Sequence, residues 1–75
     1  MDIDEIEYAL KRGERNMGGI TVDIHMDRYQ RYYAYVTDNG VNLLLETPMT
    51  VGAEGRLAFC ERISPTICEL IKKGR

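Results

Sequence analysis

The sequence predicts an α+β domain of two layers, with the element order α-β-β-β-α(α). A three-stranded antiparallel meander is expected to pack against an N-terminal helix and a broken C-terminal helix. Three observations support this prediction. The chain has 75 residues, which suits a single domain spanning 1–75. Residues 20–47 carry strand patterns around turn signals, and the segments on either side repeat apolar residues at helical spacing.

Residues 1–12 are predicted to form the first helix. Asp2 is placed to cap its N-terminus, and Glu5 three positions later completes a capping box. The expected buried stripe follows helical spacing and consists of Ile3, Ile6 and Leu10. Gly13 is one candidate for the end of the helix. The Gly18–Gly19 pair is the other, since Met17 would continue the stripe.

Three strands are predicted over residues 20–26, 31–37 and 41–47. The first alternates apolar and polar residues, as a strand with one buried face does. Asn39-Gly40 lies between the second and third, and this dipeptide is a strong signal for a two-residue hairpin turn. Pro48 is expected to end the third strand, because proline cannot donate a hydrogen bond to a neighbour.

These turns predict the register of the sheet. A two-residue turn opposes Asp38 and Val41, and therefore Tyr35 with Leu44 and Tyr33 with Glu46. A three-residue loop, 28–30, would join the first two strands. It opposes Asp27 with Arg31, His25 with Tyr33 and Asp23 with Tyr35. A slip of one residue would bury Asp23 and His25, so this register is strongly preferred.

The C-terminal region is predicted to contain a loop or weak helix start at 48–55 and then a helix in two pieces. Residues 56–63 form the first piece, with its inward side chains at Leu57, Cys60 and Ile63. Ser64-Pro65 is expected to break the helix and to restart it, since the residue before proline avoids helical geometry. The second piece places Ile67, Leu70 and Ile71 inward and ends at Lys72, Lys73 and Gly74.

Both helical regions are expected to cover the sheet face that carries Val22, Val36 and Leu43, leaving the other face to solvent or to a partner. Tyrosine and arginine are enriched where binding energy concentrates. An apolar, aromatic patch with a charged rim favours protein binding, although tyrosine is also simply a good strand former. The candidate partner-binding residues are Arg31, Tyr33, Tyr35, Leu44 and Glu46, with Asp23, His25 and Asp27 as their rim.

Composition narrows the classes of function. The chain is 44% hydrophobic and 29% charged, which is typical of a folded globule. It has no apolar run of about 18 residues and no signal peptide, so we expect a cytoplasmic protein with no membrane partner. Its formal charge of −2 disfavours direct nucleic-acid binding, which a basic stripe would support.

The reactive residue types indicate neither an enzyme nor a cofactor site. His25 would stand near Asp23, Asp27 and Tyr33, but no nucleophile or oxyanion donor converges on it. Cys60 and Cys68 do not form a CxxC pair, and with one histidine no zinc site is expected. The two cysteines are predicted to be reduced, buried thiols. We therefore expect no catalytic residues, no metal and no cofactor.

One resemblance covers the whole chain. The opening Met1-Asp2-Ile3-Asp4-Glu5-Ile6, the Asp38-Asn39-Gly40 turn and the helix, three-strand, helix order resemble small phage anti-CRISPR proteins. This resemblance implies an inhibitor that binds the nucleic-acid surface of a Cas protein. The same order is similar to the layout of double-stranded-RNA-binding domains and of HicA-type toxins, which implies a nucleic-acid-binding module instead.

The leading hypothesis is a small non-enzymatic inhibitor or adaptor of phage or mobile-element type. It would bind a larger protein through the open sheet face. Two alternatives remain at this point. A nucleic-acid-binding module would show salt-sensitive binding, because phosphate contacts release counterions. A homodimer would use the open face or a strand edge to pair with a copy of itself.

Overall fold

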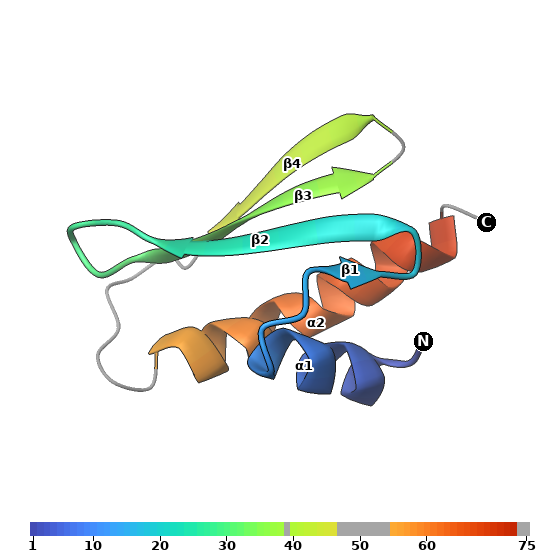
Figure 1. Ribbon diagram of the computed structural model, residues 1–75, viewed down its shortest axis with the longest axis horizontal. Helices are drawn as coiled ribbons and strands as arrows, with labels where there is room; N and C mark the ends of the chain where they lie inside the picture. Colours follow the sequence, from blue (N-terminus) through green and yellow to red (C-terminus); the bar gives the residue numbers. More distant parts are fainter. Residues whose placement is uncertain (39, 47–54, 74–75) are drawn as a thin grey trace.

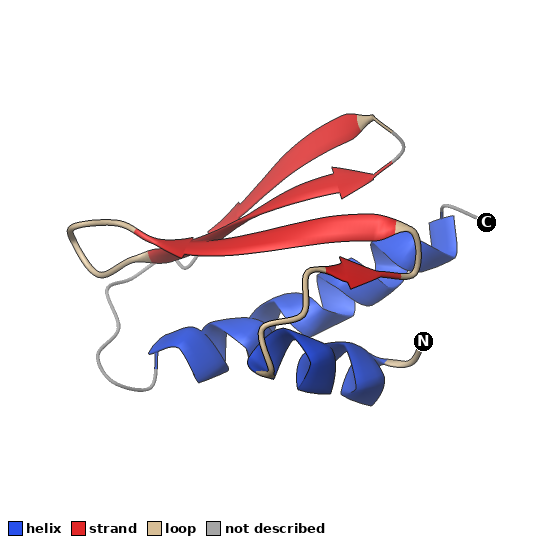
Figure 2. Cartoon of the chain, in the orientation of Figure 1, coloured by secondary structure: helices blue, strands red, loops and turns tan. Residues whose placement is uncertain are grey.

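The computed structural model describes residues 1–38, 40–46 and 55–73. The elements follow the order α1 (Ile3–Lys11), β1 (Asn16–Met17), β2 (Ile20–Met26), β3 (Tyr32–Asp38), β4 (Val41–Glu46) and α2 (Gly55–Lys73) (Figure 1). The strands form one antiparallel sheet in the order β1-β2-β3-β4. Both helices lie on the same side of it (Figure 2). The predicted α+β fold is confirmed, but the sheet gains a short fourth strand, β1.

The start of α1 is as predicted. The Asp2 carboxylate accepts the Glu5 N–H at 2.8 Å, and the Glu5 carboxylate accepts the Asp2 N–H at 3.1 Å, which completes the capping box. The buried stripe differs by one position. Ile3 is 42% exposed, and Ala9 is buried together with Ile6 and Leu10. Ile3 lies in the first turn, beyond the reach of the sheet core.

Of the two candidate ends of α1, the structure shows the one at Gly13. Its N–H donates to the Leu10 carbonyl at 3.1 Å, and the Glu14 N–H donates to the Ala9 carbonyl at 3.0 Å. This pair of bonds is the Schellman motif. From the start of α2, Arg56 donates to the carbonyls of Leu10 at 2.9 Å and Lys11 at 3.3 Å, so it joins the two helices.

The segment after α1 turns into β1 instead of extending the helix. Met17 is buried there, opposite Ile20 of β2. Gly18 and Gly19 form the connecting turn with φ values of +55° and +87°. A two-residue hairpin with positive φ at both central positions is the type I′ turn, for which Gly-Gly is well suited.

Gly18→Ala is expected to destabilise the protein more than Gly19→Ala. A Cβ atom on Gly18 would lie 2.7 Å from Ile71 Cγ2, whereas one on Gly19 would meet no heavy atom within 4 Å. Both changes place a side chain at positive φ, but only Gly18→Ala overpacks the contact with α2. The difference should be about 1–3 kcal/mol in the free energy of unfolding, measured by urea denaturation. Equal losses would contradict this contact.

The predicted register is confirmed across the sheet. Tyr35 opposes Leu44, Tyr33 opposes Glu46, and His25 opposes Tyr33. The predicted second strand begins one residue late, at Tyr32, because Arg31 closes the loop before it: the Asp27 N–H donates to the Arg31 carbonyl at 3.0 Å. Asn39 and Thr47, the remaining predicted turn and strand positions, lie outside the described residues.

Gly40→Val is expected to destabilise the β3–β4 hairpin. Gly40 has φ +81°, and a β-branched residue is strained at positive φ. The expected cost is about 1–3 kcal/mol in the free energy of unfolding. Thermal melting measures it directly, and an unchanged melting temperature would show that this turn relaxes without cost.

The predicted break in the C-terminal helix is wrong, because α2 runs continuously from Gly55 to Lys73 with Pro65 inside it. The helical bond that Pro65 cannot donate would go to the Glu61 carbonyl, and both residues are exposed. The interruption of the helical hydrogen bonds therefore lies on the side of α2 away from the core. The buried side of the helix packs without interruption. There, the Ser64 hydroxyl donates to the Cys60 carbonyl at 2.6 Å. Of the predicted loop or weak helix start at 48–55, residues 48–54 lie outside the described residues, and Gly55 is already the first residue of α2. The predicted stop at Gly74 also lies outside them.

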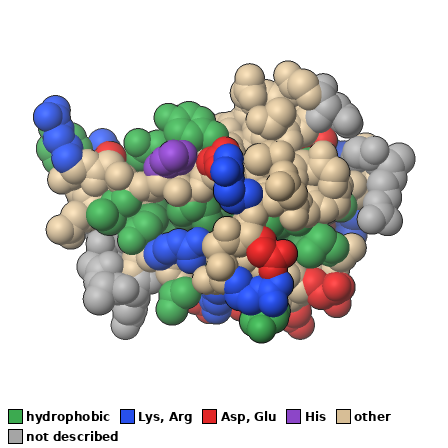
Figure 3. Space-filling view, viewed as in Figure 1, with side chains coloured by type: hydrophobic (Ala, Val, Ile, Leu, Met, Phe, Trp, Pro, Cys, Tyr) green, Lys and Arg blue, Asp and Glu red, His purple; other side chains and the backbone are tan. Residues whose placement is uncertain are grey.

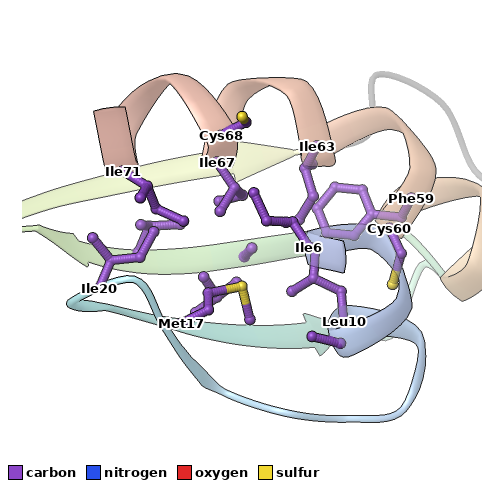
Figure 4. Close-up of a cluster of buried hydrophobic side chains, with 14 residues drawn as sticks. Ile6, Leu10, Met17, Ile20, Phe59, Cys60, Ile63, Ile67, Cys68 and Ile71 are labelled. Carbon is purple, nitrogen blue, oxygen red and sulfur yellow. The ribbon is translucent and has the colours of Figure 1, made fainter. Parts of the chain in front are cut away.

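The core lies between the helices and the sheet (Figure 4). Phe59 occupies the position in it that the sequence assigned to Leu57, and Leu57 is 51% exposed. The predicted inward position of Leu57 is therefore wrong. Cys60 and Cys68 are buried free thiols, as predicted, and burial raises the pKa of the Cys60 thiol. Of the second predicted stripe, Ile67 and Ile71 are buried, whereas Leu70 is half-buried at the margin of the core.

Candidate functional site

The sheet face opposite the helices carries a group of aromatic, apolar and acidic side chains. We call it the tyrosine face, and its residues are Asp23, His25, Tyr33, Tyr35, Leu44 and Glu46. Alternation along the strands places them together, because their neighbours Ile24, Ala34 and Leu45 turn toward the helices. Tyr35 is 51% exposed and Leu44 is 55% exposed. Figure 3 shows the histidine at the surface beside exposed hydrophobic side chains.

Three rings of the tyrosine face pack against one another. The His25 and Tyr35 ring centroids are 5.5 Å apart at 70°, and those of Tyr33 and Tyr35 are 5.6 Å apart at 88°. His25 and Tyr33 stack at 6.2 Å. Edge-to-face pairs at such distances are favourable beyond the area that they bury. Each ring therefore packs against the other two, which favours this arrangement of the cluster.

Asp27 and Arg31 lie beside this cluster, in the β2–β3 loop. Asp27 Oδ1 accepts the N–H groups of Tyr29 at 2.8 Å and Arg31 at 3.0 Å, and Asp27 Oδ2 accepts Arg31 Nε at 3.0 Å. The Tyr29 ring has guanidinium groups near its centroid, from Arg28 at 5.2 Å and Arg31 at 5.3 Å. Arg31 was predicted within a strand, but this network holds it in the loop.

The Asp27 carboxyl is expected to titrate below its ordinary pKa of 3.8. The Arg31 N–H is the largest cause, and the Tyr29 N–H and the Arg31 guanidinium lower the pKa further. Because the folded pKa lies below the unfolded one, the contribution of this carboxylate to stability is complete above the unfolded pKa. It is lost as pH falls through the folded pKa.

Carboxyl carbon shifts followed by NMR from pH 2 to 6 would measure this titration. Arg31→Ala keeps the backbone donor and removes the guanidinium, so it should return the pKa only part of the way to 3.8. A midpoint at or above 3.8 in the unchanged protein would mean that these hydrogen bonds do not hold in solution.

A shallow groove of about 160 Å³ connects the loop to the tyrosine face. Tyr32 borders it together with six of the predicted site residues, Asp27, Arg31, Tyr33, Tyr35, Leu44 and Glu46. The structure thus brings most of the predicted site together. Asp23 and His25 lie on the same face outside this groove, where Asp23 forms an ion pair with Arg15 at 2.5 Å.

Two residues near the site were missed from the sequence. Arg15 reaches Asp23 only because β1 turns back along β2, and no strand was predicted there. Tyr29 is the second, and it is not among the candidate residues taken from the sequence. The sequence did contain a signal for it, because a tyrosine between two arginines in a tight loop favours cation–π contacts.

A larger open depression of about 700 Å³ lies between the start of α1 and the end of α2. Two of its polar groups serve the helix ends. Asp2 caps α1, and the Cys68 thiol approaches the Met1 carbonyl at 3.9 Å. The other charged groups that line it, Asp4 and Lys72, have opposite signs and do not favour one class of ligand, so the tyrosine face remains the candidate site.

Comparison with protein-family models, curated proteins and solved structures finds no match to this chain. Among the described residues, no three His, Cys, Asp or Glu side chains are grouped as metal ligands would be. None of the helices in residues 1–38 and 55–73 combines the length and apolar character needed to cross a membrane. The chemistry of the tyrosine face is thus the basis for assigning a function.

Proposed function

We propose that this protein is a small non-enzymatic inhibitor or adaptor that binds a larger protein through the tyrosine face. The observation that carries the proposal is the exposed, mutually packed ring cluster of His25, Tyr33 and Tyr35 on the sheet face opposite the helices. Rigid aromatic side chains lose little conformational entropy on binding, and preorganised contacts favour affinity.

The charges around the ring cluster favour recognition by shape and apolar contact. Asp23 is paired with Arg15, and Asp27 is paired with Arg31, so these rim carboxylates are largely neutralised. Such a rim would orient a partner, and the rings at the centre would supply most of the binding energy when the partner covers them. This arrangement suits a protein surface better than a phosphate backbone, which would require free cationic groups.

The kind of partner follows from the resemblance of the opening helix and hairpin to phage anti-CRISPR proteins. On that basis the partner would be a nucleic-acid-binding effector such as a Cas protein, and the setting would be a phage or another mobile element. The protein would act by occupying a surface of the effector. It would act in the cytoplasm, where such effectors work, and it would need no cofactor.

Binding to purified Cas effector complexes, measured by titration calorimetry, tests the proposal. Tyr35→Ala should weaken binding strongly, whereas Tyr8→Ala should not. Tyr8 is also an exposed tyrosine, 60% accessible against 51% for Tyr35, but it lies on α1 in the other layer. Equal effects of the two changes would contradict a role for the tyrosine face. Binding to RNA with a steep dependence on salt would instead support the nucleic-acid alternative.

A further inference from the structure

The outer edge of β4 presents backbone groups that no described strand pairs with, since β4 is the last strand of the sheet. Bonded and non-bonded pairs alternate along an antiparallel ladder, and the two-residue turn after Asp38 makes Asp38 and Val41 a bonded pair. Every second residue of β4 from Val41 therefore bonds to β3. The N–H and C=O groups of Asn42, Leu44 and Glu46 point away from the sheet.

The other end of the sheet confirms this alternation. The bond from the Asp27 N–H to the Arg31 carbonyl makes those two residues a bonded pair. Counting along the β2–β3 register assigns the backbone groups of Tyr33 and Tyr35 to β2. The backbone groups of Ala34 and Val36 therefore bond to Leu45 and Leu43 of β4. Counting from the β2–β3 loop thus gives the same outward residues on β4 as counting from the β3–β4 turn.

Within the part of the chain that the structure describes, β4 shows none of the usual protection of an edge strand. Natural edge strands carry lysine, proline or a bulge, or are covered by another segment. The first part of the opposite edge follows this rule, because β1 pairs with Ile20 and Thr21 of β2 and the Val22 N–H donates to the Arg15 carbonyl at 2.7 Å. β4 has one charged residue, Glu46, and its exposed side chains include Val41 and Leu44, 56% and 55% accessible.

We propose that β4 pairs with β4 of a second copy of this chain, antiparallel and about a twofold axis at Leu44. Leu44 would oppose its own symmetry mate, and Asn42 would oppose Glu46 of the other copy. These opposed residues all carry outward backbone groups, so each pair exchanges two hydrogen bonds, about six in all. The pairing joins the two sheets into one.

The side chains select this register over its neighbours. The Thr37 hydroxyl donates to Asn42 Oδ1 at 3.3 Å, which leaves the Asn42 amide N–H groups free to donate to a carboxylate. In the proposed register each of these amides faces Glu46 of the other copy. A shift by two residues in either direction brings Leu44 opposite Asn42 or Glu46. The Asn42 amide of one copy then no longer faces the Glu46 carboxylate of the other.

The dimer would also extend the tyrosine face. Tyr35 lies beside Leu44 in each copy, so the shared row would run from Tyr35 through two Leu44 side chains to the second Tyr35. Leu43 and Leu45, half-buried in one copy, would meet across the axis on the helix side. The pairing does not depend on the proposed partner, and its test uses this protein alone.

Sedimentation velocity across micromolar to millimolar concentrations is the test. We expect a monomer–dimer equilibrium. Asn42→Glu should raise the dimer dissociation constant on the order of tenfold, because twofold symmetry opposes it to Glu46 twice. Asn42→Lys should lower it. Leu44→Pro removes an outward N–H without removing a backbone hydrogen bond to β3, and it should abolish the dimer, with circular dichroism confirming that the variant is folded.

Met26→Glu and Met26→Lys are the matched controls, since Met26 is 55% exposed at the end of β2, beyond the residues that pair with β1 and on the opposite side of the sheet from β4. Neither should change the dissociation constant. A protein that stays monomeric at millimolar concentration overturns the proposal. So does a dimer that responds equally to Asn42→Glu and Asn42→Lys, or one that responds to the Met26 variants instead.

Discussion

Phe59→Ala is expected to lower the free energy of unfolding by about 3–5 kcal/mol. Phe59 is 1% exposed, is among the largest fully buried side chains and lies 6.2 Å from the Tyr32 ring between centroids. Removing it leaves a cavity where α2 meets the sheet. Since the free energy of unfolding of a small domain is only about 5–15 kcal/mol, this single change should remove much of the stability of the protein.

Leu57→Ala is the matched control on the same helix. Leu57 is 51% exposed, so its truncation should change stability by no more than about 0.5 kcal/mol. Urea denaturation of both variants gives the comparison. A larger loss at Leu57 than at Phe59 would mean that α2 is rotated and that the inward stripe suggested by the sequence is right after all.

Tyr35→Ala is expected to separate binding from folding. Tyr35 is half exposed on the tyrosine face, so its truncation should cost little stability. It should remove about 2 kcal/mol or more of the free energy of partner binding if this ring is an anchor. Tyr33→Ala should weaken binding as well, with a larger cost in stability because Tyr33 is half-buried and contacts both other rings.

Val36→Ala, at the position next to Tyr35, is expected to lower stability without weakening binding. Val36 is 1% exposed on the helix side of β3, so its truncation should leave a cavity and lower the melting temperature. Binding by the folded fraction should not change. Melting and partner titration measure the two effects separately. Unfolding of both tyrosine variants would place the rings in the core and remove the proposed surface.

Local rules were sufficient for much of this fold. Asp2 and Glu5 satisfy each other within one helical turn, so the helix start requires no distant contact. The period-two alternation of β2 and the length of the β3–β4 turn determine which residues oppose each other. The membership of the tyrosine face follows from this register, as Tyr35 and Leu44 demonstrate. These features depend on neighbours in sequence or on a single hairpin.

The features that the sequence did not predict depend on contacts between distant segments. The helix continues through Pro65 because its buried side packs along the whole core, which offsets one lost hydrogen bond. Arg15 reaches Asp23 only after Gly18 packs against Ile71 and turns β1 beside β2. Phe59 is buried where the sequence predicted Leu57, on a helix whose start is joined to the end of α1 through Arg56. Local propensity contributes tenths of a kcal/mol to about 1 kcal/mol per residue, and burial of a whole helix face outweighs it.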